Sequence, residues 1–154
     1  MMKNIFKIAA TLSLVALASN FTDGWAQASV GAEGRAGLYT DNSDFHIGAG
    51  LRIGMPVVTI VPNAEYVFVD GGKFYTLNLD GQINVLTLPL TSLWLGGGLA
   101  WLNYDPDNSD SFSDTGANLF AGFGLNAIVL KPYLQAKYII TDSDQFVLSV
   151  GLRF

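Results

Sequence analysis

The last ten residues, 145–154, read Gln-Phe-Val-Leu-Ser-Val-Gly-Leu-Arg-Phe and alternate between two kinds of side chain. One face carries only large apolar residues, namely Phe146, Leu148, Val150, Leu152 and Phe154. The other face is mostly small or polar and includes Arg153. Because side chains of a β-strand point alternately to opposite faces, this period of two predicts a strand with one fully apolar face.

The same alternation runs through the chain from residue 29 onward, with no helical period anywhere. It predicts strands at 30–39, 45–55, 58–69, 74–87, 92–103, 116–128, 132–141 and 145–154. Alternating segments of about ten residues separated by turn residues are typical of transmembrane β-barrels. The expected fold is therefore an all-β, eight-stranded antiparallel up-and-down barrel.

Charged residues within these segments all fall on the face opposite the apolar one. They are Glu33, Arg35, Arg52, Glu65, Asp80, Lys137 and Arg153. In a soluble barrel the polar face meets water, and so few charges would solvate eight strands poorly. A membrane barrel turns its polar face inward. We therefore expect these residues to form a charge network that plugs the lumen, because buried charges are costly unless paired. Separately solvated charges in a wet lumen are the alternative.

The composition limits the other function classes. The chain has 154 residues, of which 50% are hydrophobic and 14% are charged. No uncharged apolar stretch of about 18 residues follows residue 28, so a helical membrane span is not expected. Without cysteine, neither a disulfide framework nor a thiolate metal site is available. Residues 105–110 lack the glycine and glutamate of a calcium-binding loop, so no metal or other cofactor is expected.

The first 28 residues have the pattern of a cleavable signal peptide. Lys3 and Lys7 precede an apolar run at 8–18, and Ala26-Gln27-Ala28 offers a cleavage site before Ser29. Residues 16–18 offer a second site, and a short anchoring helix is the alternative reading. We expect export through the inner membrane and a single barrel domain at 29–154. That domain has six basic and twelve acidic residues and no basic patch, which excludes nucleic acid as a partner.

Nine of those twelve acidic residues lie in every second connection between the expected strands. They are Asp41, Asp44, Asp70, Asp105, Asp107, Asp110, Asp114, Asp142 and Asp144. The other connections are apolar turns that contain Pro56, Pro89 and Pro132. Aspartate favours turns in general, but this does not explain its restriction to alternate ones. We expect one acidic end, facing outward, with short loops except at about 104–115.

Residues 29–154 resemble the eight-stranded outer-membrane barrels of the OmpA membrane-domain and OmpX type. The resemblance rests on the strand count, the alternate polar loops and the terminal strand ending at Phe154. That ending is similar to the signal through which this family engages the outer-membrane insertion machinery. The resemblance implies a monomer in the cell outer membrane, in contact with lipid and lipopolysaccharide, with periplasmic chaperones acting during its biogenesis.

Four function classes fit this pattern. The favoured one is a non-enzymatic barrel that contributes to envelope integrity or surface interaction. The second is a narrow pore for ions or very small solutes. A lipid-modifying enzyme would need His46, the only histidine, but no serine is paired with it by sequence pattern, so no catalytic residue is assigned. The fourth is a soluble, lipocalin-like binder.

Overall fold

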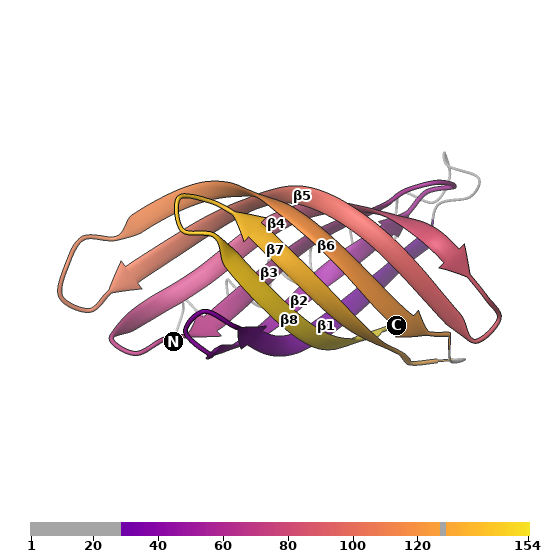
Figure 1. The fold of residues 1–154 in the computed structure, drawn as a ribbon, viewed down its shortest axis with the longest axis horizontal. Helices are drawn as coiled ribbons and strands as arrows, with labels where there is room; N and C mark the ends of the chain where they lie inside the picture. Colours follow the sequence, from indigo (N-terminus) through magenta and orange to yellow (C-terminus); the bar gives the residue numbers. More distant parts are fainter. Residues whose placement is uncertain (1–28, 127–128) are drawn as a thin grey trace, which may run out of the picture.

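The computed structural model of the chain describes residues 29–126 and 129–154, which form one closed antiparallel barrel in the order β1 to β8 (Figure 1). The strands are β1 (Ser29–Tyr39), β2 (Asp44–Gly54), β3 (Thr59–Phe68), β4 (Gly72–Thr87), β5 (Thr91–Pro106), β6 (Phe112–Leu125), β7 (Lys131–Ile140) and β8 (Gln145–Arg153). The predicted eight-stranded up-and-down barrel is confirmed. The expected signal peptide lies outside the described residues. Within the described ranges, no helix is both long and apolar enough to cross a membrane.

Pairing between the first and last strands closes the barrel. β1 pairs with β8 from Glu33 opposite Arg153 to Tyr39 opposite Val147, and it pairs with β2 along its other edge. Each of the strands β2 to β7 pairs with the strand before it and the strand after it in the sequence, so tight hairpins suffice to connect consecutive strands. Where the strands overlap around the barrel, neither edge is left unpaired, so the backbone groups of those segments are satisfied within the barrel.

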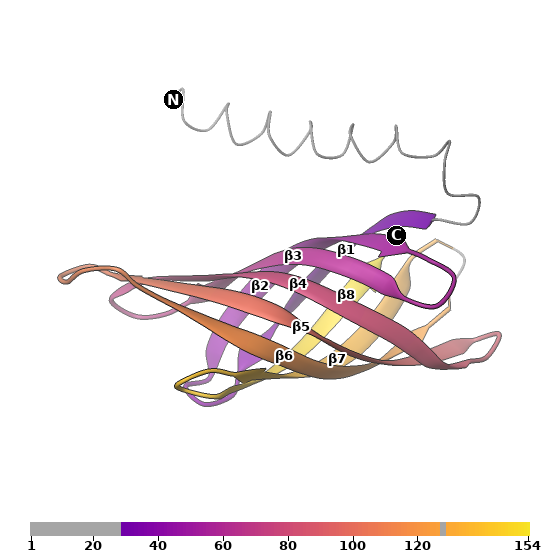
Figure 2. The same cartoon turned by 90° about the horizontal axis from the view of Figure 1, so that it is seen from above.

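The eight strands differ in length. β4 and β5 have 16 residues each and β6 has 14, whereas β8 has only nine. The expected long loop at 104–115 is wrong, because β5 continues to Pro106 and β6 already begins at Phe112. The many aspartates in this stretch led us to expect a loop. In the structure, however, the backbones of β5 and β6 stay paired here, with Leu102 opposite Asp114. The β5–β6 hairpin projects furthest at one end of the barrel, and the β4–β5 hairpin at the other (Figures 1 and 2).

The core of the protein is the interior of the barrel, and part of it is aromatic. Trp94, Phe120 and Tyr133 form a buried cluster. Glycines paired with them on the neighbouring strands make room for two of these rings: a Cβ atom at Gly122 would overlap the indole of Trp94, and one at Gly151 would overlap the Tyr133 ring. An eight-stranded barrel is just wide enough for side chains to fill it, and these glycines determine where the largest of them fit.

Candidate functional site

The middle of the lumen holds a chain of ion pairs centred on Glu65. Lys137 Nζ lies 2.7 Å from Glu65 Oε1, and Arg35 Nη1 lies 3.2 Å from the same oxygen. Arg35 also pairs with Glu33. These four side chains are at most 2% exposed. They come from β1, β3 and β7, so the contacts cross the interior of the barrel.

Two further arginines extend this chain towards one end of the barrel. Arg52 Nη1 lies 2.9 Å and Arg153 Nε 3.3 Å from Glu33 Oε2. The Arg153 guanidinium also lies over the ring of Trp94, 3.6 Å from its centroid, and 4.5 Å from that of Tyr133. Such cation–π contacts stabilise a cation that is partly removed from water. Ion pairs thus connect six of the seven charged residues named from the sequence.

The seventh, Asp80, contacts amides instead of a cation. Its carboxylate accepts hydrogen bonds from Asn63 at 2.8 Å and from Asn118 at 2.9 Å. Asn78 connects this amide cluster to Thr76, whose hydroxyl lies 3.5 Å from Glu65. The three asparagines were not singled out in the sequence, although each lies on the inward face of its strand, which was the available signal.

Between this polar level and one mouth of the barrel lies an apolar layer inside the lumen. It consists of Tyr39, Val67, Ala100, Leu102, Ile139 and Val147, all at most 7% exposed. The Tyr39 hydroxyl donates to Glu65 Oε2 at 3.0 Å, which places the layer directly against the ion pairs. An apolar layer here was not predicted from the sequence, although alternation places Tyr39 and Val147 on the inward faces of their strands. The feature of the sequence that could have predicted the layer is the presence of large apolar residues at inward positions of the strands, such as Val67 and Ile139.

Beyond the apolar layer the mouth widens into a vestibule with a volume of about 520 Å³. Its apolar lining includes Val69, Phe74, Leu102, Tyr104 and Phe112, and its acidic lining comprises Asp41, Asp44, Asp70, Asp114 and Asp142. This chemistry favours a cation over an anion. In the part of the chain that the structure describes, no three His, Cys, Asp or Glu side chains are placed to hold a metal ion.

His46 does have a serine neighbour, which the sequence did not reveal. His46 Nε2 lies 3.1 Å from Ser149 Oγ, and the histidine is fully buried. The two residues are 103 positions apart, and they meet only because β8 closes against β1. Its other ring nitrogen, Nδ1, has no partner among the described residues, so no carboxylate orients the ring as in a catalytic triad.

The outer surface of the barrel is apolar. Exposed side chains on it include Leu79, Leu99, Leu119, Leu134 and Val150, each more than half exposed. The five apolar residues of the terminal strand also point outward, with exposed fractions from 39% for Phe146 to 63% for Phe154. Their role as an insertion signal stays a prediction.

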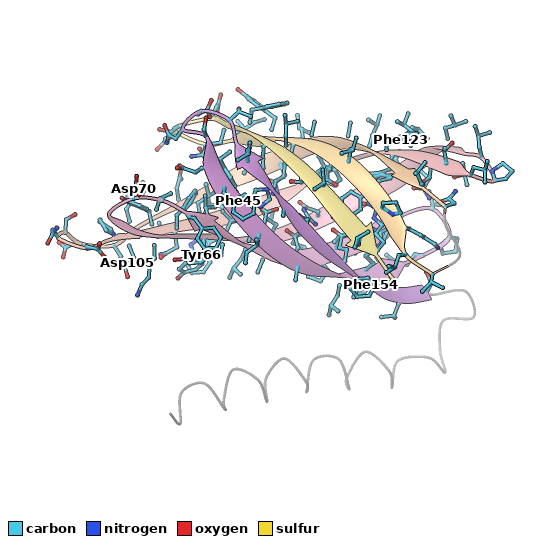
Figure 3. The ribbon with its side chains drawn as sticks, turned by 90° about the horizontal axis from the view of Figure 1, so that it is seen from below. Phe45, Tyr66, Asp70, Asp105, Phe123 and Phe154 are labelled. Atoms are coloured by element: carbon cyan, nitrogen blue, oxygen red, sulfur yellow. The ribbon has the colours of Figure 1, made fainter. Side chains whose placement is uncertain are left out.

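The two ends of the barrel differ in chemistry. The end with the turns after β1, β3, β5 and β7, here called the aspartate end, carries Asp70 and Asp105, with Phe45 and Tyr66 on the wall nearby (Figure 3). The opposite end, with the turns after β2, β4 and β6, is called the proline end after Pro56 and Pro89, whereas Pro132 lies within β7; Phe123 and Phe154 lie at this end (Figure 3). Aromatic side chains near strand ends are typical of the interfacial girdles of membrane barrels.

No protein-family model and no curated protein matches the chain. Solved structures do. The N-terminal β-barrel domain of Pseudomonas aeruginosa OprF superposes with a TM-score of 0.72 at 17% identity, covering 83% of this chain and 98% of that one. Neisserial surface protein A gives 0.64 at 13%, covering 82% and 97%. A de novo designed transmembrane β-barrel gives 0.60 at 14%, covering 81% and 92%. The chain therefore has the fold of the small eight-stranded outer-membrane barrels of the OmpA/OmpX type.

Proposed function

We propose that this protein is a non-enzymatic barrel of the outer membrane whose lumen is plugged by its own side chains, and that it contributes to envelope integrity or surface interaction. The apolar outer surface supports the location, because a continuous surface of exposed large apolar side chains, among them Leu99 at 62%, is costly to expose to water and is stable in contact with lipid. In this arrangement the aspartate end faces the exterior, and Ser29 and Phe154 lie on the periplasmic side.

The observation that carries the plugged lumen is the succession of two filled levels along the barrel. The ion pairs of Glu65, Arg35 and Lys137 occupy one level, and the layer around Val67 and Ile139 occupies the next. An ion would have to displace paired charges and then cross an apolar constriction without its hydration shell. Both steps are costly in free energy, which supports the plugged barrel over the narrow pore.

Membrane fractionation tests the location. We expect residues 29–154, expressed behind the native leader, to fractionate with the outer membrane and to migrate faster on a gel before boiling than after it. Recovery of the folded chain in the soluble fraction without detergent would instead support the lipocalin-like binder.

Planar-bilayer recording tests the lumen. The wild-type barrel should give no stable unitary conductance. A variant that combines Glu65→Ala with Ile139→Ala and Val147→Ala shortens side chains at both levels and serves as the positive control for an opened lumen. Stable conductance of the wild type would favour the narrow pore.

The enzyme alternative has its own test at His46. The burial of the His46–Ser149 pair supports a structural role. We expect His46→Ala to leave outer-membrane lipid composition unchanged in cells that express it. A change in lipid composition seen with the wild type and abolished in this variant would support a lipid-modifying enzyme.

The proposed partners are lipopolysaccharide at the aspartate end and, during biogenesis, periplasmic chaperones and the insertion machinery. The outward row that ends at Phe154 supports the last of these. Reconstituted insertion machinery should accelerate folding of the wild type more than that of Phe154→Ser. Equal acceleration of both chains would count against recognition through the terminal strand.

A further inference from the structure

The β4–β5 hairpin extends beyond the other turns at the proline end (Figures 1 and 2). No charged residue occurs between Asp80 and Asp105, a stretch that includes the whole hairpin tip. At the turn, Leu88 is 50% exposed and Leu90 is 75% exposed. Polar residues usually occupy barrel turns that face water, so an apolar tip of this kind indicates a surface that another apolar phase covers.

A β-bulge extends the apolar outer surface of the barrel towards this tip. Asn84 pairs with Trp94, whereas Leu86 pairs with Leu93, so Val85 is an additional residue in β4. A shift of one residue exchanges the two faces of a strand. The bulge therefore places Leu86 on the outer side together with Leu93, where both are exposed. Without it, Leu86 would point to the inner side of the hairpin.

The neighbouring turn is hydrogen-bonded to the tip and adds to its apolar surface. The Asn126 backbone N–H donates to the Leu90 carbonyl at 2.8 Å, and its side-chain amide donates to the Leu88 carbonyl at 3.0 Å. Further along, Val129 is 73% exposed and Leu130 is 49% exposed. Leu86, Leu88, Leu90, Val129 and Leu130 together are called the apolar tip below.

We propose that the apolar tip is an interaction surface for phospholipid, immersed at the boundary between acyl chains and headgroups of the periplasmic leaflet. This rests on the proposed membrane location. Two observations favour lipid over a protein as the occupant. The tip continues the apolar outer surface through Ile83, Leu86 and Leu93. Next to it, the exposed Lys131 at the start of β7 lies opposite Arg153 on the lumen side of the barrel rim and supplies a cation at the level of anionic headgroups.

The chemistry of the two ends agrees with this assignment. All nine aspartates of the turns and strand ends lie at the aspartate end, and the described residues of the proline end expose no carboxylate side chain. The β4–β5 side of the barrel then meets lipid over a greater length than the shorter β8–β1 side.

Single cysteines provide the test, because the chain has none of its own. Leu90→Cys places an environment-sensitive fluorophore on the apolar tip. Leu99→Cys places it in the middle of β5 on the lipid-facing wall, and Asn108→Cys places it in the β5–β6 turn of the aspartate end. Each labelled barrel is refolded into phosphatidylethanolamine–phosphatidylglycerol vesicles that contain no other protein. Quenching is then measured with lipids brominated near the headgroup or deep in the chain, and with iodide admitted to both sides.

We expect the Leu90 label to show blue-shifted emission, quenching by lipids brominated near the headgroup, and loss of iodide quenching relative to the Asn108 label. The same label accompanied by Leu86→Asp and Leu88→Asp should shift back to the red. A Leu90 label that iodide quenches as strongly as the Asn108 label would overturn the inference and point to a protein partner or bare solvent. If the Leu99 label also escaped lipid quenching, the proposed membrane location itself would be wrong.

Discussion

Two neighbouring levels of the lumen are built by the same strands but differ completely in chemistry. β3 contributes Glu65 to the ionic level and Val67 to the apolar layer, and β7 contributes Lys137 and Ile139 in the same way. In each strand the two residues are separated by a single outward-facing position. The ionic level depends on specific partners, because a buried charge without its counterion is strongly destabilising. The apolar layer depends on volume and shape alone. Substitutions at the two levels should therefore destabilise the barrel for different reasons.

The largest loss of stability is expected on substitution of Glu65, which pairs with both Lys137 and Arg35. Glu65→Ala leaves Lys137 and one side of Arg35 buried without their shared carboxylate, which should lower the free energy of unfolding by about 3–5 kcal/mol. Urea unfolding of the barrel in lipid vesicles, followed by tryptophan fluorescence, measures the change. A loss below about 1 kcal/mol would indicate that the charges are solvated separately.

A double substitution tests whether the barrel needs the buried ion pair itself or only side chains that fill the same space. Combining Glu65→Leu with Lys137→Met removes both buried charges and keeps the volume, while Arg35 retains Glu33. Apolar replacement of a whole buried ion pair is often close to neutral. The double variant should therefore be more stable than Glu65→Ala in the same urea titration. If it is less stable, the ion pair itself makes a large net contribution.

The apolar layer should show a cavity effect instead. Ile139 is fully buried, and its truncation to alanine should cost about 3 kcal/mol, because the barrel wall limits how far the neighbours can relax. Ile140 is the matched control, since it is 43% exposed on the outer side of the same strand. Ile140→Ala should cost markedly less in parallel urea titrations. Equal losses would mean that the layer is loosely packed.

Substitutions in the amide cluster should lower the free energy of unfolding by an intermediate amount. Asn118 donates to Asn78 and to Asp80 at 2.9 Å each, so Asn118→Ala leaves two buried acceptors with fewer donors. We expect a loss of about 1–3 kcal/mol in the same assay. Asn108→Ala, in the exposed turn at the aspartate end, should be neutral and serves as the control.

The smallest effect is expected at the surface of the aspartate end. The Tyr138 hydroxyl donates to Asp144 at 2.6 Å, but both groups are exposed to solvent. Water replaces such a bond readily, so Asp144→Ala should leave the midpoint of heat-modifiable migration unchanged within error. A clear shift would reveal that this turn is coupled to the interior.

Alternation along each strand was sufficient to predict which side of the barrel Glu65, Lys137 and Phe154 would face, and with it the fold. It was not sufficient to predict their neighbours. Asp80 shares the inward face with the other charges, yet it binds asparagines from β3 and β6 rather than a cation. Ser149 could not be matched to His46, because that contact needs the first and last strands to meet.

The sequence by itself determined the period of two, the apolar outer surface and the segregation of aspartates to alternate turns, since these follow from the local geometry of a strand. Only the tertiary structure decided which inward residues lie at the same level of the lumen and how far β5 and β6 extend into residues 104–115. It also decided where the bulge at Val85 falls. Those features depend on register and closure. Both are set by the packing of all eight strands against one another, and no local pattern specifies them.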